Sequence, residues 1–118
     1  VSGPGTIAQA HIEQMSHQPI VFALANPIPE IMPADAKRAG AYVIATGRSD
    51  FPNQINNSLA FPGIFRGALD NGVKNITDEM KLAAAKKIAS LVKNPTPAEV
   101  IPPVMTPDLV KKVASAIK

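Results

Sequence analysis

The sequence contains no cysteine and no tryptophan, and aromatic residues make up only 4% of its 118 positions. The absence of cysteine excludes a disulfide framework and a thiolate metal site. No apolar run approaches the roughly 18 residues that a membrane span needs, and no basic-then-apolar leader stands at the start. We therefore expect a protein without a membrane segment, located in the cytoplasm.

Hydrophobic residues make up 46% of the chain, and with so few aromatics they are mainly Ala, Val, Ile and Leu. Such a core favours helices packed on parallel strands over a β-sandwich. The net charge is +3, but the 12 Lys and Arg are spread along helical faces. A nucleic-acid surface clusters its basic residues, so the charge indicates solvated helices and no nucleic-acid partner.

Two short apolar runs, IVFALA at 20–25 and AYVIAT at 41–46, are typical of parallel strands buried on both faces. Between them, Pro33 opens and Gly40 closes a short expected helix. This βαβ order predicts the α/β class, with a partial doubly wound parallel sheet followed by C-terminal helices. Tyr42 is expected in the core, and His11 and His17 at the surface.

The remaining apolar periodicity predicts helices over 7–15, 58–69, 77–92 and from 107 onward. Pro62 is expected to kink its helix, and Thr106 to cap the last one, with Leu109, Val110, Val113 and Ile117 turned inward. Two strands rarely form a stable sheet alone. Residues 1–118 are therefore expected to be a single domain or a fragment, with the earlier strands of a larger domain lying before them.

Neutral amides gather in the loops that follow the two expected strands. Asn26 follows immediately after the first strand, and the loop GRSDFPNQINN at 47–57 ends with Asn56 and Asn57 at a helix start. Ligands of open parallel sheets bind at this edge, and a helix start favours an anion. A carboxamide adds a neutral donor suited to a carboxylate or a nicotinamide ribose.

The same residues also have plainer interpretations. Asn56 is suited to capping its helix, and Asn26 before Pro27 is ordinary turn chemistry. Arg48 and Asp50 fit a clamp on a substrate carboxylate or, more simply, a local ion pair or a subunit contact. From spacing alone, a ligand site and a set of structural amides both stay open.

The segments VSGPG, PIVFALANPIPEI and AYVIATGRSDFPNQINNSLAFPGIFRGALD, followed by EMKLAAAKKIA and VIPP, resemble the C-terminal part of the NAD(P)-binding domain of bacterial and archaeal malic enzymes. The resemblance covers nearly the whole chain and implies a Rossmann-type domain. It implies an oxidoreductase that oxidises malate by hydride transfer to NAD or NADP and releases carbon dioxide and pyruvate. A divalent Mg or Mn ion would be held by residues upstream of this chain.

By this resemblance, Asn26 would contact malate and the nicotinamide ribose, and Asn57 would contact a malate carboxylate. Ser2, Gly3 and Asn56 would complete the cofactor-binding set. The family's catalytic Tyr, catalytic Lys and metal ligands have no counterpart here, so no catalytic or metal-binding residue is assigned and the chain alone is expected to be inactive. The expected partners are malate or pyruvate, the rest of the enzyme chain, and further copies in a homodimer or higher oligomer.

Two other functions stay open from the sequence. A different Rossmann dehydrogenase, such as an amino-acid or tetrahydrofolate dehydrogenase, would need its own catalytic Lys or acid near the amides. A noncatalytic interaction module would have its two-strand sheet completed by a partner chain. The choice between NAD and NADP also stays open, because the residue that reads the ribose 2′ position follows an upstream strand.

Overall fold

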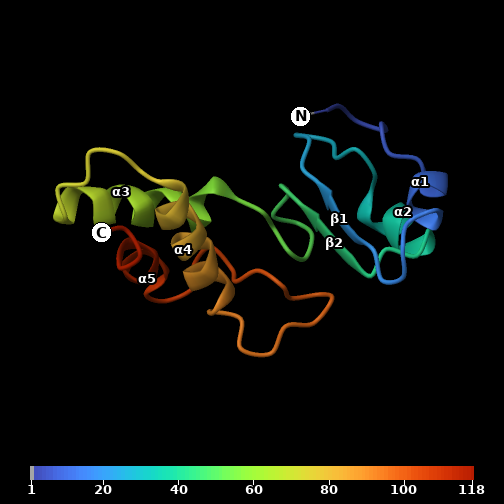
Figure 1. Ribbon diagram of the computed structural model, residues 1–118. Helices are drawn as coiled ribbons and strands as arrows, with labels where there is room; N and C mark the ends of the chain where they lie inside the picture. The colour runs from blue at the N-terminus through green and yellow to red at the C-terminus, as the bar shows by residue number, and fades with distance from the viewer. Residues whose placement is uncertain (1) are drawn as a thin grey trace. The chain divides into compact units, whose positions relative to one another are not determined.

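The computed structural model describes residues 2–118 and divides them into two compact units (Figure 1). The first contains the chain up to Ile55 together with Pro95–Glu99, and the second contains Asn56–Asn94 together with Val100–Lys118. Each unit has its own buried apolar cluster. The first residue of the VSGPG segment lies outside the described residues.

The first unit contains a parallel pair of strands, β1 (Ile20–Ala23) and β2 (Val43–Thr46). Helices α1 (Gln9–Glu13) and α2 (Pro33–Arg38) accompany them, and α2 connects the two strands (Figure 1). Proline stands in the first turn of α2, where its missing N–H leaves no hydrogen bond unmade. The expected βαβ order and parallel pairing are confirmed, although α1 is shorter than the helix predicted over 7–15.

The core of this unit lies against one face of β1. Alternate residues of β1 point into the core, whereas Ile20 and Phe22 are 61% and 51% exposed. The prediction that both strands are buried on both faces is therefore right for β2 and wrong for β1. Tyr42 is 46% exposed, so its prediction as a core residue is also wrong. The core itself consists of Ile12, Val21, Ala23, Ile31, Ala36, Ala39, Ala41 and Ile44.

The second unit is helical. A short 3-10 helix, η1 (Asn57–Leu59), leads into α3 (Phe61–Asp70), and α4 (Asp78–Ala89) and α5 (Leu109–Ala114) follow (Figure 1). The hydroxyl of Thr77 accepts a hydrogen bond from the N–H of Met80 at 3.3 Å and so caps α4. The three longer helices confirm the predicted ones in order and type.

Three predicted helix features are wrong. Pro62 lies in the first turn of α3, where proline is tolerated, and so it starts the helix instead of kinking it. Thr106 does not cap α5, because its hydroxyl donates to the Pro103 carbonyl at 2.7 Å and Asp108 precedes the helix. Val110 is 42% exposed, whereas the other three residues predicted to face inward from α5 are buried.

Glycines on α3 allow α5 to approach closely. A Cβ atom at Gly63 would lie 2.5 Å from the Cβ of Val113, and one at Gly67 would lie 2.5 Å from the carbonyl oxygen of Ala114. Residues four apart share one face of a helix, so both glycines face α5. The packing of these two helices therefore depends on the absence of side chains at both positions.

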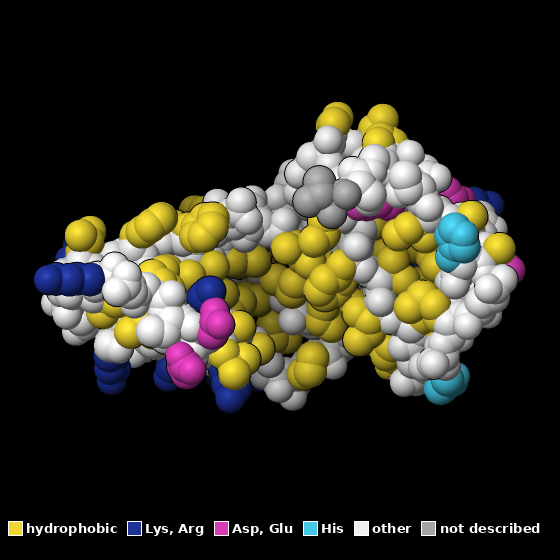
Figure 2. All heavy atoms as spheres, turned by 45° about the horizontal axis from the view of Figure 1, so that its top comes forward, with side chains coloured by type: hydrophobic (Ala, Val, Ile, Leu, Met, Phe, Trp, Pro, Cys, Tyr) yellow, Lys and Arg dark blue, Asp and Glu magenta, His cyan; other side chains and the backbone are white. Residues whose placement is uncertain are grey.

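Hydrophobic side chains also remain at the surface of both units (Figure 2). In the second unit, Phe61 and Phe65 of α3 are both more than half exposed, and their ring centroids lie 5.9 Å apart. Within residues 2–118, none of the helices has the length and apolar character needed to cross a membrane.

Candidate functional site

The loop after β1 places Asn26 beyond the carboxyl end of that strand. The Asn26–Pro27 peptide bond is cis, and the Asn26 side chain is exposed. Within the described part of the chain, no residue donates a hydrogen bond to this side-chain amide or accepts one from it. Its carbonyl oxygen and its N–H donors are therefore available to a ligand.

The buried side chain of Glu30 forms hydrogen bonds that hold this loop in place. The residue is only 7% exposed. One carboxylate oxygen accepts a hydrogen bond from the hydroxyl of Ser2 at 2.6 Å, and the other accepts from the N–H of Ala25 at 3.0 Å. These hydrogen bonds favour the charged form and hold the pKa of Glu30 below its ordinary value. Glu30 thus joins the segment that contains Ser2 to the residue before Asn26.

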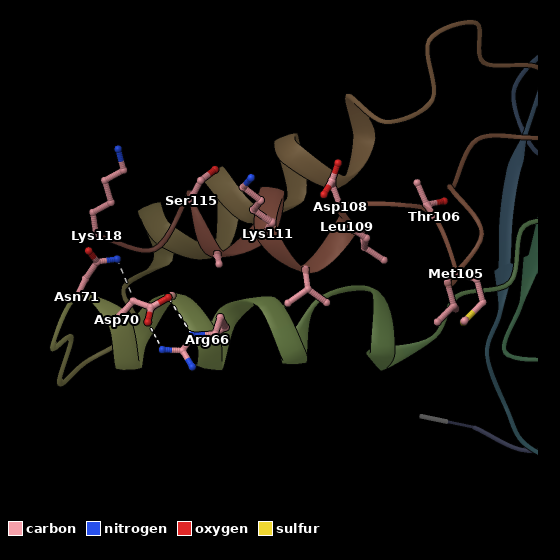
Figure 3. Close-up of a pocket in the computed structure, with 14 residues that line it drawn as sticks. Arg66, Asp70, Asn71, Met105, Thr106, Asp108, Leu109, Lys111, Ser115 and Lys118 are labelled. Atoms are coloured by element: carbon pink, nitrogen blue, oxygen red, sulfur yellow. Dashed lines mark hydrogen bonds and ion pairs between the residues drawn. The ribbon is translucent and has the colours of Figure 1, made fainter.

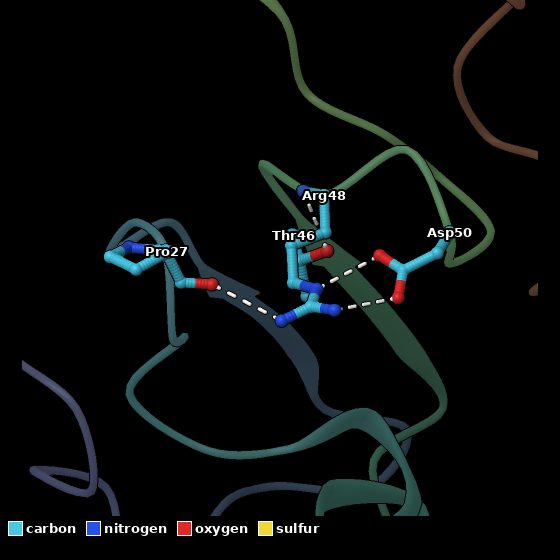
Figure 4. A network of polar contacts seen from close by, with 4 residues as sticks. All are labelled: Pro27, Thr46, Arg48 and Asp50. Atoms are coloured by element: carbon cyan, nitrogen blue, oxygen red, sulfur yellow. Dashed lines mark hydrogen bonds and ion pairs between the residues drawn. The ribbon is translucent and has the colours of Figure 1, made fainter.

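Arg48 contacts the residue after Asn26 (Figure 4). Its Nε and Nη2 donate to the two carboxylate oxygens of Asp50 at 2.8 and 2.7 Å, and its Nη1 donates to the Pro27 carbonyl oxygen at 3.3 Å. The hydrogen bond from Arg48 lowers the pKa of Asp50. The simpler interpretation of Arg48 and Asp50, a local ion pair, is therefore confirmed.

Gly47, directly after β2, approaches the Asn26 side chain. A Cβ atom at this position would lie 3.0 Å from Nδ2 and 3.3 Å from Oδ1 of Asn26. Gly47 thus allows a close approach, because a Cβ atom here would displace the Asn26 amide by a few tenths of an ångström. The contact lies at the carboxyl ends of the paired strands β1 and β2, the edge at which parallel sheets bind ligands.

Two other amides in this loop serve the fold. Asn53 is 7% exposed, and its Nδ2 donates to the carbonyl oxygens of Ile44 at 3.2 Å and Pro97 at 3.0 Å. Gln54 donates through Nε2 to the Gly47 carbonyl oxygen at 3.4 Å. These side chains donate hydrogen bonds to main-chain carbonyls, some of them buried. Without these donors, the irregular loop would leave the carbonyls unpaired. Part of the amide-rich pattern is therefore structural.

Asn56 and Asn57 lie at the start of the second unit. The side-chain oxygen of Asn56 accepts a hydrogen bond from the N–H of Ser58 at 2.9 Å, which caps η1 as the plainer interpretation predicted. Asn57 is the first residue of η1 and is exposed. No described residue forms a hydrogen bond with the Asn57 side chain, so its carboxamide is as available to a ligand as that of Asn26.

Ser2 and Gly3 lie in the first unit. Ser2 is connected to the Asn26 loop through Glu30, and the Gly3 carbonyl accepts a hydrogen bond from the Thr6 hydroxyl at 2.9 Å. A Cβ atom at Gly3 would meet nothing within 4 Å. The structure thus links two of the predicted site segments, whereas the placement of Asn57 near Asn26 stays a prediction.

The hollow of about 820 Å³ between α3 and α5 is a separate feature (Figure 3). None of the predicted site residues lines it. Arg66 pairs with Asp70 across its floor, and Asn71 donates to the carbonyl oxygens of Gly67 at 3.0 Å and Ile117 at 2.8 Å. Because these three side chains already have partners within the second unit, we assign no ligand to the hollow.

The described residues form no metal site of their own. Among residues 2–118, no three His, Cys, Asp or Glu side chains gather closely enough to hold a metal ion. His11 and His17 are exposed, as predicted, and the Nδ1 of His11 accepts a hydrogen bond from the N–H of Ala8 at 3.1 Å.

Sequence reasoning missed Glu30 and Gly47. Glu30 is the single charged residue in the segment NPIPEIMP, and an acid isolated among apolar residues signals a buried, hydrogen-bonded carboxylate. Gly47 follows an apolar strand directly, which is a signal for close approach of another main chain or side chain. Both signals were present in the sequence, but neither identifies the residue with which Glu30 or Gly47 makes contact.

Comparison with known proteins identifies the family. The family model for the NAD binding domain of malic enzyme matches residues 2–118. The chain is 53% identical to the NAD-dependent malic enzyme of Geobacillus stearothermophilus, covering 99% of this chain and 25% of that protein. It is 43% identical to the NADP-dependent malic enzyme of Escherichia coli, covering 98% of this chain and 18% of that protein.

The solved structures agree. The malic enzyme of Pyrococcus horikoshii aligns with a TM-score of 0.93 at 55% identity, over 99% of this chain and 27% of that one. The NAD-dependent malic enzyme of Thermotoga maritima aligns with a TM-score of 0.92 at 45% identity, over 100% of this chain and 31% of that one. The chain thus spans about a quarter of the length of such relatives. It belongs to the NAD-binding domain family of the malic enzymes, which are decarboxylating oxidoreductases, and its βαβ unit is part of their Rossmann-type fold.

Proposed function

We propose that this chain supplies part of the cofactor and malate site of an NAD(P)-dependent malic enzyme, which converts malate to pyruvate and carbon dioxide. The observation that carries the proposal is the available carboxamide of Asn26, held where the carboxyl ends of β1 and β2 meet. Ligands bind at this edge in open parallel sheets. Family membership favours this function over that of another Rossmann dehydrogenase.

In this proposal, Asn26 donates to malate and to the nicotinamide ribose, and Asn57 donates to a malate carboxylate. Ser2, Gly3 and Asn56 line the cofactor. The residues fit a dinucleotide because Asn26 offers unused hydrogen-bonding groups and Gly3 leaves space for close approach. When bound, the nicotinamide accepts the hydride from C2 of malate. The amides orient the reacting atoms without taking up a proton, and such orientation supplies a large part of the rate.

Substitution of the two carboxamides tests the proposal in the full-length enzyme that carries this chain. Asn26→Ala and Asn57→Ala each remove a hydrogen bond to a charged or reacting group, which lowers kcat/KM for malate by about 10- to 100-fold. Asn75→Ala is the matched control, because Asn75 is also an exposed amide and lies in the connection between α3 and α4. The proposal fails if the two variants have the same malate kinetics as this control.

The catalytic residues and the divalent metal, Mg or Mn, are provided in this proposal by the remainder of the enzyme chain, and the enzyme is a homodimer or higher oligomer. The isolated chain of 118 residues is therefore inactive. Mixing it with malate, manganese and either NAD or NADP gives no absorbance increase at 340 nm, whereas the full-length enzyme at the same concentration gives one with the cofactor that it uses. Appreciable NADH or NADPH formation by the isolated chain would contradict this part of the proposal.

A further inference from the structure

We propose that Glu30 and Arg48 are positioning residues for Asn26: Glu30 fixes the residue before it and Arg48 the residue after it, so that its carboxamide is oriented before ligands bind. The inference rests on the proposed role of Asn26 in holding malate and the nicotinamide ribose. Neither Glu30 nor Arg48 is assigned a contact with either ligand.

The environment of Glu30 supports a positioning role. A buried carboxylate is unfavourable unless it is hydrogen-bonded, and an apolar residue would fill the same space without that penalty. Glu30 uses both carboxylate oxygens, one on the Ser2 hydroxyl and one on the Ala25 N–H. Its main-chain carbonyl also accepts a hydrogen bond from the N–H of Ile7 at 3.2 Å. One residue thus ties the segment before α1 to the end of β1.

The environment of Arg48 supports the same role on the other flank of Asn26. Asp50 binds Nε and Nη2 of the guanidinium and so aims Nη1 at the Pro27 carbonyl (Figure 4). The ring of Phe51 lies beneath the guanidinium, with its centroid 5.3 Å from the central carbon. Only the planar fork of arginine makes these contacts together, so lysine does not replace it.

Gly47 completes the arrangement. Its lack of a side chain lets the chain at the end of β2 reach the Asn26 amide, which limits the space into which that amide can rotate. The Asn26 loop is therefore contacted at three successive residues: Ala25 by Glu30, Asn26 by Gly47, and Pro27 by Arg48. This is the arrangement of a preformed site.

The two positioning residues differ in a way that an experiment can detect. Glu30 also binds Ser2, which is proposed to line the cofactor, whereas no contact joins Arg48 to Ser2 among the described residues. Loss of Glu30 therefore weakens cofactor binding more than loss of Arg48 does. Both losses reduce catalysis with malate.

The test uses the full-length enzyme with Glu30→Ala, Glu30→Gln, Arg48→Ala and Arg48→Lys. We expect Glu30→Ala and Arg48→Ala to lower kcat/KM for malate by about 10- to 100-fold, since small displacements of an orienting group have effects of this size. In NADH fluorescence titrations, we expect Glu30→Ala to raise the Kd several times more than Arg48→Ala does. Glutamine can still accept from Ala25 and donate to Ser2, so Glu30→Gln retains more activity than Glu30→Ala.

The controls are Glu13→Ala and Arg38→Ala, which remove exposed charges on α1 and α2. Circular dichroism verifies that each variant is folded; if Glu30→Ala does not fold, Arg48→Ala and Arg48→Lys decide. The inference is overturned if Arg48→Ala and the folded Glu30→Ala match the controls while Asn26→Ala loses activity, or if Glu30→Ala and Arg48→Ala have the same Kd for NADH. If Asn26→Ala itself matches the controls, the proposed function fails instead.

Discussion

Replacing Gly67 with alanine introduces a methyl group into the contact between α3 and α5. The new Cβ atom would lie 2.5 Å from the Ala114 carbonyl oxygen, 2.8 Å from the Ile117 Cβ and 3.0 Å from the Ala114 Cα. Ordinary contact begins at 3.4 Å, so the closest distance is 0.9 Å too short (3.4 minus 2.5). Because two of these atoms belong to the main chain, rotation of a side chain cannot relieve the overlap.

Two opposing effects decide the outcome. Alanine stabilises a helix interior relative to glycine by about 0.5–1 kcal/mol. Overpacking of a closely packed core costs about 1–3 kcal/mol, and a shift of α5 also loosens the contacts of the fully buried Val113 and Ile117. The overlap at main-chain atoms places the cost near its upper end. We therefore expect Gly67→Ala to lower the free energy of unfolding by about 2 kcal/mol.

Thermal denaturation followed by circular dichroism measures this effect as a fall in Tm of several degrees. Gly3→Ala is the matched control, because it adds the same methyl group where nothing lies within 4 Å. An unchanged or higher Tm for Gly67→Ala, relative to Gly3→Ala, would refute the close approach of the two helices.

Three further predictions concern the cap of α4, the Asn26 contact and the pH dependence of stability. Thr77→Ala removes the hydroxyl that caps α4 and lowers the free energy of unfolding by about 1 kcal/mol, measured by urea denaturation, whereas Thr77→Ser retains the cap and most of the stability. Gly47→Ala places a methyl group 3.0 Å from the Asn26 Nδ2 and shifts that amide by a few tenths of an ångström. We expect this shift to raise KM for malate several-fold in steady-state kinetics of the full-length enzyme. Unchanged kinetics would show that catalysis does not depend on the position of the amide. Because the pKa of Glu30 is lower in the folded state, its contribution to stability is fully present above the ordinary value of about 4.5 and is lost as pH falls through the lowered pKa. As pH falls below about 4.5, Tm should therefore decrease less steeply for Glu30→Gln than for the unsubstituted protein. Equal slopes of Tm against pH for these two proteins would contradict the lowered pKa of Glu30.

Several features that depend on neighbours in the sequence were predicted correctly. Arg48 and Asp50 are two residues apart, and the Asn56 cap reaches a residue two positions further on. The parallel strands and α2 followed from two apolar runs separated by a helix that begins at Pro33. For the ion pair, the cap and the start of α2, the physical cause is a local hydrogen bond or the geometry of proline and lies within a few residues, whereas the strand pairing was inferred from the βαβ order.

The failures have other causes. An apolar run shows that a strand is hydrophobic, but not which of its faces other elements cover, so the exposure of Phe22 and Tyr42 was missed. Thr106 was predicted to cap α5 from its residue type, yet its hydroxyl finds a partner at Pro103. Where several local arrangements have similar energies, packing elsewhere in the molecule selects among them.

The sequence by itself determined the family of this chain, its α/β class and the positions of its carboxamides along the strand ends. Only the tertiary structure decided which amides are occupied by the fold and which remain available. Glu30 binds Ser2 across 28 positions of sequence and Asn53 binds Pro97 across 44. A residue's hydrogen-bonding capacity is fixed by its type, but whether that capacity is already used depends on groups that only the folded chain brings within about 3 Å.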